Sequence, residues 1–107
     1  MRRMDRKQAT ERYEKTRRPG VWAMRCGAQV WVGAGPDLAA ARNRVEFALG
    51  QGQAPYHALA QAMAAHGPAA FSFEELESLE KVEEIALPRV LKEKRAEAAA
   101  RLGGIEI

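Results

Sequence analysis

The sequence has only one cysteine, Cys26, so no disulfide can form within the chain. Cysteine and histidine are also not clustered at the spacing of a zinc site. The longest run without Asp, Glu, Lys or Arg, residues 47–73, is interrupted by glutamine, histidine, proline and glycine, so no helix in it could cross a bilayer. The charged start, residues 1–5, lacks the apolar core of a secretory signal. These absences predict a cytoplasmic protein with no membrane partner.

What the chain does contain is typical of one globular domain. Its 107 residues are 47% hydrophobic and 29% charged, which is far from the balance of a disordered chain. A chain of this length buries about 65% of its unfolded surface, which is enough for a core without disulfides or metal. We therefore expect a single domain that folds on its apolar core.

The net charge of +3 is unevenly distributed. Residues 1–18 carry eight basic and three acidic groups, whereas residues 74–84 carry one basic and six acidic groups. A basic segment can neutralise phosphates and release counterions, although solvated charged helices occur in proteins of every function. We divide the chain into a basic N-terminal helix or arm, residues 1–18, and a folded domain, residues 19–107.

The first predicted element of the domain is a β-hairpin. Two runs rich in apolar residues, 21–26 and 29–32, flank Gly27-Ala28, and glycine at the first position suits a two-residue turn. This loop pairs Trp22 with Gly33, so that Trp22 and Trp31 share one face of the sheet. We expect the two indoles to be in contact there.

Helices and a third strand are expected after the hairpin. Asp37 can cap a helix over 38–49, and a second helix begins at Pro55 and ends at Gly67. A third strand begins at Phe71, with its phenylalanines on one face.

The last part of the chain, residues 79–102, has a helical pattern that Pro88 is expected to divide into two helices. Together these elements predict an α/β (α+β) fold with a small three-stranded antiparallel sheet flanked by helices.

Two short motifs resemble the name motif of the GIY-YIG nuclease superfamily, in particular its short bacterial single-domain members. They are Gly20-Val21-Trp22 and Trp31-Val32-Gly33. The turn at Pro36-Asp37-Leu38, the exit at His66-Gly67 and the segment 70–74 are also similar to that family. The resemblance covers about residues 7–79 and implies a GIY-YIG endonuclease-like fold for residues 19–107.

The resemblance implies metal-dependent hydrolysis of a phosphodiester, but the catalytic positions are substituted. The family's two tyrosines fall on Trp22 and Trp31, its helix arginine on Ala41 and its histidine on Val45. An indole N–H donates a hydrogen bond but accepts no proton, and Ala and Val have no polar group. The resemblance therefore implies a degenerate catalytic motif, and we expect no cleavage.

The metal-binding glutamate implied by the resemblance falls on Glu93 or Glu97. Either carboxylate would hold Mg or Mn if the domain were active, because a divalent cation stabilises the leaving oxygen. Otherwise we expect no cofactor.

Six residues are candidates for contact with nucleic acid: Arg17, Arg18, Trp22, Trp31, Arg42 and Arg44. One residue on a helix is a rotation of about 100°, so Arg42 is expected to point away from the sheet, whereas Arg44 lies near the face of Ala41. The alternative for the arginines is a solvated helix surface. The alternatives for the tryptophans are core packing and a platform on which bases stack.

Three functions follow from this interpretation. The favoured one is a nuclease-family domain that has lost catalysis and binds DNA or RNA weakly. A regulatory or interaction module with an unknown protein partner is the second. An active metal-dependent endonuclease with substituted catalytic residues is the third, because a fold alone does not fix function.

Overall fold

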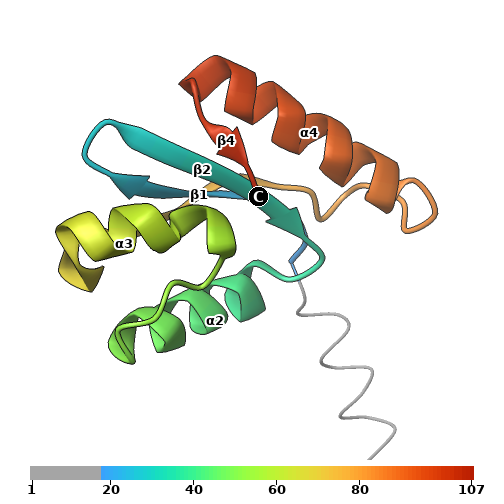
Figure 1. Cartoon of the computed structure of the whole chain (residues 1–107). Helices are drawn as coiled ribbons and strands as arrows, with labels where there is room; N and C mark the ends of the chain where they lie inside the picture. Colours follow the sequence, from blue (N-terminus) through green and yellow to red (C-terminus); the bar gives the residue numbers. More distant parts are fainter. Residues whose placement is uncertain (1–17) are drawn as a thin grey trace, which may run out of the picture.

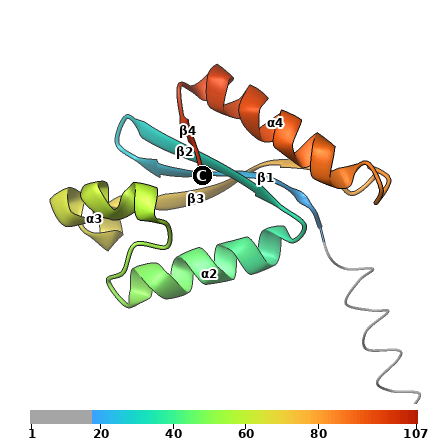
Figure 2. The same ribbon diagram turned by 45° about the vertical axis from the view of Figure 1, so that its right-hand side comes forward.

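A computed structural model of the chain describes residues 18–107, which form a four-stranded sheet between two layers of helices (Figures 1 and 2). The strand order is β3-β1-β2-β4. The predicted α+β class is confirmed, but the sheet has four strands rather than three. The helix expected within residues 1–18 and the candidate Arg17 lie outside the described residues.

The hairpin has the predicted register. Strand β1 (Gly20–Cys26) pairs antiparallel with β2 (Gln29–Gly35), and Trp22 lies opposite Gly33. Gly27 begins the turn with a φ of 59°, a backbone conformation that glycine adopts without steric cost. Strand β3 (Ser72–Ser78) pairs with the other edge of β1, also antiparallel.

Two helices and two 3-10 turns connect β2 to β3. The carboxylate of Asp37 accepts hydrogen bonds from two backbone amides and so caps α2 (Leu38–Gly50) as predicted. The second expected helix is shorter: it consists of the 3-10 turn η1 (His57–Leu59) and α3 (Ala60–His66). Gly67 ends α3 at a φ of 77°, and the 3-10 turn η2 (Pro68–Ala70) leads into β3.

The expected division of the last helix at Pro88 is wrong. Residues 80–86 form turns, and one helix, α4 (Leu87–Leu102), follows them. Pro88 lies in the first turn of α4, where its missing N–H has no partner to lose and its fixed φ suits the helix. None of the helices within residues 18–107 is long and apolar enough to span a membrane.

The additional strand, β4 (Ile105–Glu106), runs parallel to β2. Gly103 ends α4 in the left-handed conformation, which turns the chain back toward the sheet. The Arg95 guanidinium donates to Glu106 at 3.1 Å and to the carbonyl oxygen of Ile107 at 3.4 Å. These tertiary contacts hold a strand that is too short to have a hydrophobic period of its own.

The two faces of the sheet have separate cores. Trp22, Met24 and Trp31 belong to the cluster beneath α2 and α3, which we call the aromatic face. Val21, Ala23 and the neighbouring valines of β2 pack against α4, and we call this the aliphatic face. Alternate residues of a strand point to opposite faces, so the same hairpin supplies both cores.

Candidate functional site

The four substituted catalytic positions lie together in the core of the aromatic face. The exposed fractions are 2% for Trp22, 1% for Trp31, 6% for Ala41 and 0% for Val45. Side chains this deeply buried cannot touch a phosphodiester or an attacking water in this conformation. Core packing is therefore what the structure shows for the tryptophans, and the alternative in which bases stack on exposed indoles does not fit their burial.

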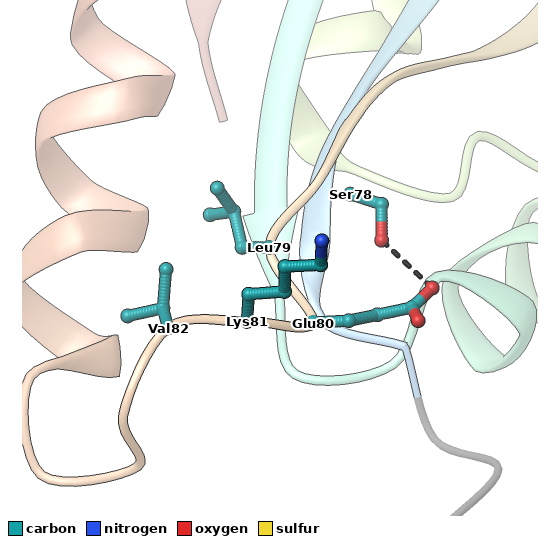
Figure 3. Close-up of a pocket in the computed structure, with 5 residues that line it drawn as sticks. All are labelled: Ser78, Leu79, Glu80, Lys81 and Val82. Carbon is teal, nitrogen blue, oxygen red and sulfur yellow. Dashed lines mark hydrogen bonds between the residues drawn. The ribbon is translucent and has the colours of Figure 1, made fainter.

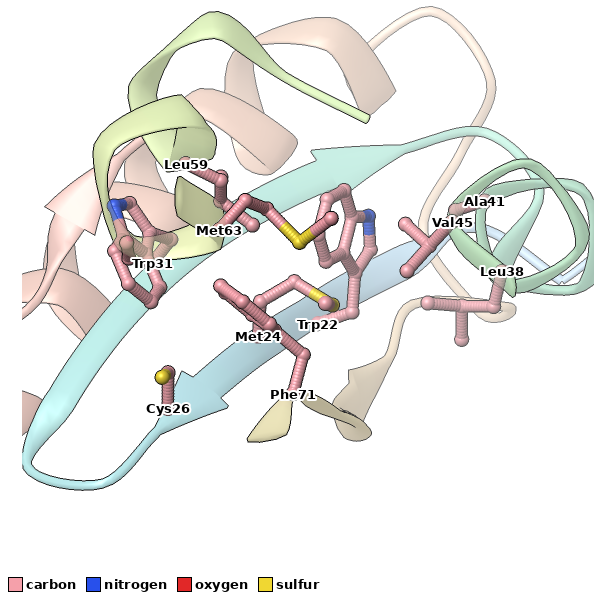
Figure 4. Close-up of a cluster of buried hydrophobic side chains, with 11 residues drawn as sticks. Trp22, Met24, Cys26, Trp31, Leu38, Ala41, Val45, Leu59, Met63 and Phe71 are labelled. Atoms are coloured by element: carbon pink, nitrogen blue, oxygen red, sulfur yellow. The ribbon is translucent and has the colours of Figure 1, made fainter. Parts of the chain in front are cut away.

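Both tryptophans lie on the predicted face, but each ring packs against a different neighbour (Figure 4). The centroid of the Trp22 ring is 5.3 Å from that of Phe73, and the Trp31 ring is 5.8 Å from Phe71. Figure 4 shows Met24 and Met63 between the two indoles, which differs from the expected direct contact.

The glycines of the two motifs are required by close packing. A Cβ on Gly33 would lie 2.7 Å from two ring atoms of Trp22, well inside van der Waals contact. A Cβ on Gly20 would lie 2.8 Å from the Leu38 side chain and would also collide with the Glu77 carbonyl oxygen. The motif glycines therefore let the Trp22 ring lie on β2 and let β1 approach β3.

Two arginines of α2 lie on aromatic rings that flank Trp22. The Arg42 guanidinium lies 4.7 Å from the Phe73 centroid, and that of Arg44 lies 5.3 Å from the Tyr56 centroid. The Tyr56 centroid is in turn 5.6 Å from that of Trp22, and Arg44 also donates a hydrogen bond to the Tyr56 hydroxyl. We call these five residues the arginine-aromatic row. A guanidinium over a ring is held by a cation-π interaction, which orders the side chain before any ligand arrives.

The position of Arg42 corrects the expectation that it points away from the sheet. Helix geometry does rotate it away from Ala41, but its long apolar stem reaches the edge of the helix and places the guanidinium on β3. Arg42 also pairs with Glu46 at 3.5 Å, one helical turn away. Both arginines therefore border the buried side of α2, one along each edge.

A carboxylate that the sequence analysis did not single out, Glu75, also lies on the aromatic face. It is paired with Trp22 across β1 and β3 and is two residues from Phe73, so the three share a face. Arg18 donates to both of its oxygens, at 2.9 and 3.3 Å. This hydrogen-bonded carboxylate raises the pKa of the Arg18 guanidinium. Arg18, a predicted contact for nucleic acid, is thus already paired.

The described residues contain no ready-made cluster of ligands for a divalent cation. Within residues 18–107 no three His, Cys, Asp or Glu side chains gather as ligands, and Glu75 is occupied by Arg18. Glu93 and Glu97 lie on α4, which covers the aliphatic face, and they pair with Arg89 at 3.7 Å and Lys94 at 4.0 Å. The structure therefore separates both predicted ligands from the positions of the family's catalytic residues.

A cavity of about 330 Å³ lies at the end of β3 (Figure 3). Its five lining residues are consecutive, Ser78 to Val82, and Ser78 and Glu80 are joined by a hydrogen bond of 2.9 Å. Because one turn supplies every wall, this cavity brings together no chemistry from separate elements.

The partners of the arginines, Phe73 and Tyr56, were also missed by the sequence analysis. The alternation along the third strand could have indicated Phe73, because it places the phenylalanines of that strand on one face of the sheet. The position of Tyr56 depends on how the loop after α2 returns to the sheet, which no local pattern encodes.

A hairpin carrying both glycine motifs, followed by two helices, an edge strand and a last helix, has a GIY-YIG endonuclease-like fold. Among solved structures, the chain is similar to the catalytic domain of the homing endonuclease I-TevI, with 21% sequence identity and a TM-score of 0.63. The match covers 83% of this chain and 97% of that domain. No family model matches the sequence, and no curated protein matches it.

Proposed function

We propose that this domain binds nucleic acid through the arginine-aromatic row and does not cleave it. The observation that carries the proposal is the pair of α2 arginines held on Phe73 and Tyr56. Arginine has five N–H donors in a planar fork that suits phosphate. Arg42 uses one N–H donor for Glu46, and Arg44 uses one for Tyr56. Most of their N–H donors therefore remain for a ligand.

We infer that the charge of the basic N-terminal segment supports the same binding. Residues 1–17 carry seven basic and three acidic groups, whereas residues 18–107 carry ten and eleven. The carbonyl oxygen of Arg18 accepts a 2.8 Å hydrogen bond from the backbone N–H of Leu38, at the start of α2. The basic segment is therefore joined to the domain at the helix that carries Arg42 and Arg44, where its charge can attract the same strand.

Loss of cleavage is supported by the core of the aromatic face. General acid-base catalysis needs a side chain that exchanges a proton within hydrogen-bond reach of the attacking water. Trp22, Trp31, Ala41 and Val45 offer no such group and are covered by neighbouring side chains. The carboxylate on this face, Glu75, is held by Arg18, which competes with a metal ion for its oxygens.

Binding is tested by fluorescence anisotropy with labelled single-stranded and double-stranded oligonucleotides over a range of salt. Affinity should fall as the salt concentration rises. Each phosphate contact should contribute a decrease of about 0.9 log units of affinity per log unit of salt for B-DNA, and about 0.7 for single strands. The double variant R42Q/R44Q should bind about tenfold more weakly, with a slope reduced by about two contacts.

A matched control is R89Q/R101Q, which removes two arginines from α4 on the opposite side of the sheet. It should change affinity by less than about twofold, because these residues lie away from the row. No binding at low salt would refute the proposal and favour the interaction module. Equal losses in the two double variants would refute the assigned surface.

Cleavage is tested with supercoiled plasmid in the presence of magnesium or manganese. We expect no nicking above that of a buffer control. Metal-dependent nicking that is lost in Glu75→Gln or Glu93→Gln would show that the domain is an active endonuclease with substituted residues.

A further inference from the structure

A second site lies beside Trp31, on the part of the aromatic face that the arginine-aromatic row does not reach. A cavity of about 250 Å³ opens there between β2, α3 and β4. Gln29 and Trp31 of β2, Gln61 and His66 of α3 and Ile105 of β4 line it, together with three alanines of η1 and α3. Unlike the cavity in Figure 3, it is built by elements that are far apart in the sequence.

The indole nitrogen of Trp31 is the feature that marks this cavity as a site. It is buried and has no hydrogen-bond partner within residues 18–107. Figure 4 shows it on the side of the ring that faces α3, away from Phe71. An indole nitrogen only donates, and buried donors in folded proteins are nearly always paired. Trp31 lines the cavity, but its indole nitrogen is covered, so a ligand there supplies the missing acceptor when the side chains over the nitrogen shift on binding.

The rim of the cavity fixes the chemistry of that ligand. Gln29, Gln61 and His66 are exposed, and no hydrogen bond engages their side chains within residues 18–107. Each glutamine amide both donates and accepts. Among residues 18–107, no Asp, Glu, Lys or Arg lines the cavity, which favours an uncharged ligand over an anion. The volume is below the roughly 300–1,000 Å³ of sites for drug-sized molecules, which suits a ligand as small as a single base.

We infer that the Trp31 cavity binds a pyrimidine base. The base carbonyl accepts the Trp31 indole N–H, and the glutamine amides hydrogen-bond its polar edge, as proteins do with unpaired bases. The part of this inference that concerns a base within a nucleic acid strand rests on the proposed function. Tyr56, which holds Arg44, directly precedes η1, so phosphates at Arg44 and a base at Trp31 would contact neighbouring elements.

The inference is tested by NMR on the 15N-labelled full chain. The sequence has two tryptophans, so two indole signals are expected, and Trp31→Phe assigns them. Titration with cytidine or uridine should shift the Trp31 signal saturably and leave the Trp22 signal in place. Adenosine should bind more weakly, because adenine has no carbonyl oxygen to accept the indole N–H.

Gln61→Leu should weaken pyrimidine binding about tenfold, the effect of one lost hydrogen bond to a ligand. The matched control is Gln53→Leu, an exposed glutamine in the loop after α2 that does not line the cavity. It should leave the titration unchanged. Equal weakening by the two variants, or no shift of the Trp31 signal with any pyrimidine, would overturn the inference.

Two oligonucleotides of equal length separate this inference from the proposed function. An oligo-thymidine strand should shift the Trp31 signal, whereas an abasic strand should shift only signals near Arg42 and Arg44. Strand binding that never moves the Trp31 signal overturns the cavity inference and leaves the proposed function standing. A shift with free nucleosides but no binding of strands overturns the proposed function and assigns the cavity to free pyrimidines.

Discussion

The two faces of the sheet are built from alternate residues of the same hairpin, yet they differ in almost every property. The aromatic face carries two tryptophans and the methionines Met24 and Met63, beneath two short helical segments. The aliphatic face carries Val21, Ala23 and Val32, against the single long helix α4. Small side chains let α4 lie along the strands, whereas large rings fill the irregular space beneath α2 and α3.

The groups that could recognise a ligand lie on one of these two faces. The aromatic face carries the arginines on aromatic rings, the Glu75–Arg18 pair and the Trp31 indole nitrogen, which has no partner within the described part of the chain. The aliphatic face offers ion pairs along an exposed helix surface, such as Arg89 with Glu93. Function is therefore expected to be sensitive to changes on the aromatic face and largely insensitive to changes on α4.

The largest expected effect comes from adding one methyl group beneath Trp22. Gly33→Ala should lower the free energy of unfolding by about 3 kcal/mol, because the new Cβ overlaps the indole and forces a shift of a packed ring. The measurement is urea denaturation followed by circular dichroism.

Gly35→Ala is the matched control on the same strand. A Cβ at Gly35 has no atom within 4 Å, so its effect should be within about 0.5 kcal/mol of zero. Similar losses for the two variants would mean that Trp22 does not lie on Gly33, and the description of the aromatic face would be wrong.

Local signals predicted the hairpin and the start of α2 well. The register followed from the two-residue turn at Gly27, and the helix start followed from the cap at Asp37. The signal at Pro88 was misread, since proline breaks a helix interior but is favoured in the first turn. Strand β4 was missed because its two residues depend on Arg95 and on pairing with β2.

The candidate site could be predicted only in part. The substituted positions, such as Trp22, could be read from the motif, but the burial that closes them requires the packing of α2 and α3. Arg42 was placed by helix rotation alone, which ignores the reach of its stem. Glu75 became visible only with the register of β3, in which a bulge near Trp22 shifts the pairing.

The second prediction compares two neighbouring glutamates of β3. Glu75→Gln should raise affinity for a single strand about threefold to tenfold and should increase the salt slope by about 0.7, because Arg18 is released for a phosphate. Its cost in stability should be below about 1 kcal/mol, since the Arg18 and Glu75 side chains are 42% and 31% exposed. Anisotropy titrations and urea denaturation measure the two effects.

Glu74→Gln removes the same charge from the other face. Glu74 lies opposite Ala23 and pairs with Arg25 at 2.7 Å. This variant should change affinity by less than about twofold, as its site is separated from the row by the sheet. If Glu74→Gln raised affinity as much as Glu75→Gln, net charge rather than the aromatic face would govern binding.

The smallest effects are expected on α4, for Glu93→Ala and Glu97→Ala. Their ion pairs span one helical turn, and the glutamate side chains are 58% and 68% exposed. Such pairs contribute about 0.3–0.5 kcal/mol, and alanine's higher helix propensity offsets part of the loss. Each variant should therefore unfold within about 0.5 kcal/mol of the parent and bind oligonucleotides equally well.

The same two variants test whether α4 carries a metal ligand. Manganese is paramagnetic and broadens the NMR signals of nuclei close to it, so titration of the 15N-labelled chain locates any bound ion. We expect no broadening centred on Glu93 or Glu97, because each is an exposed carboxylate already paired with a basic residue, and no group of three possible ligand residues lies there within residues 18–107. Broadening that is centred there and lost in either variant would place a metal site on the side of the aliphatic face. Such a metal would lie across the sheet from Trp22, so cleavage through it would have to use residues on the side of the aliphatic face rather than the substituted positions of the motif.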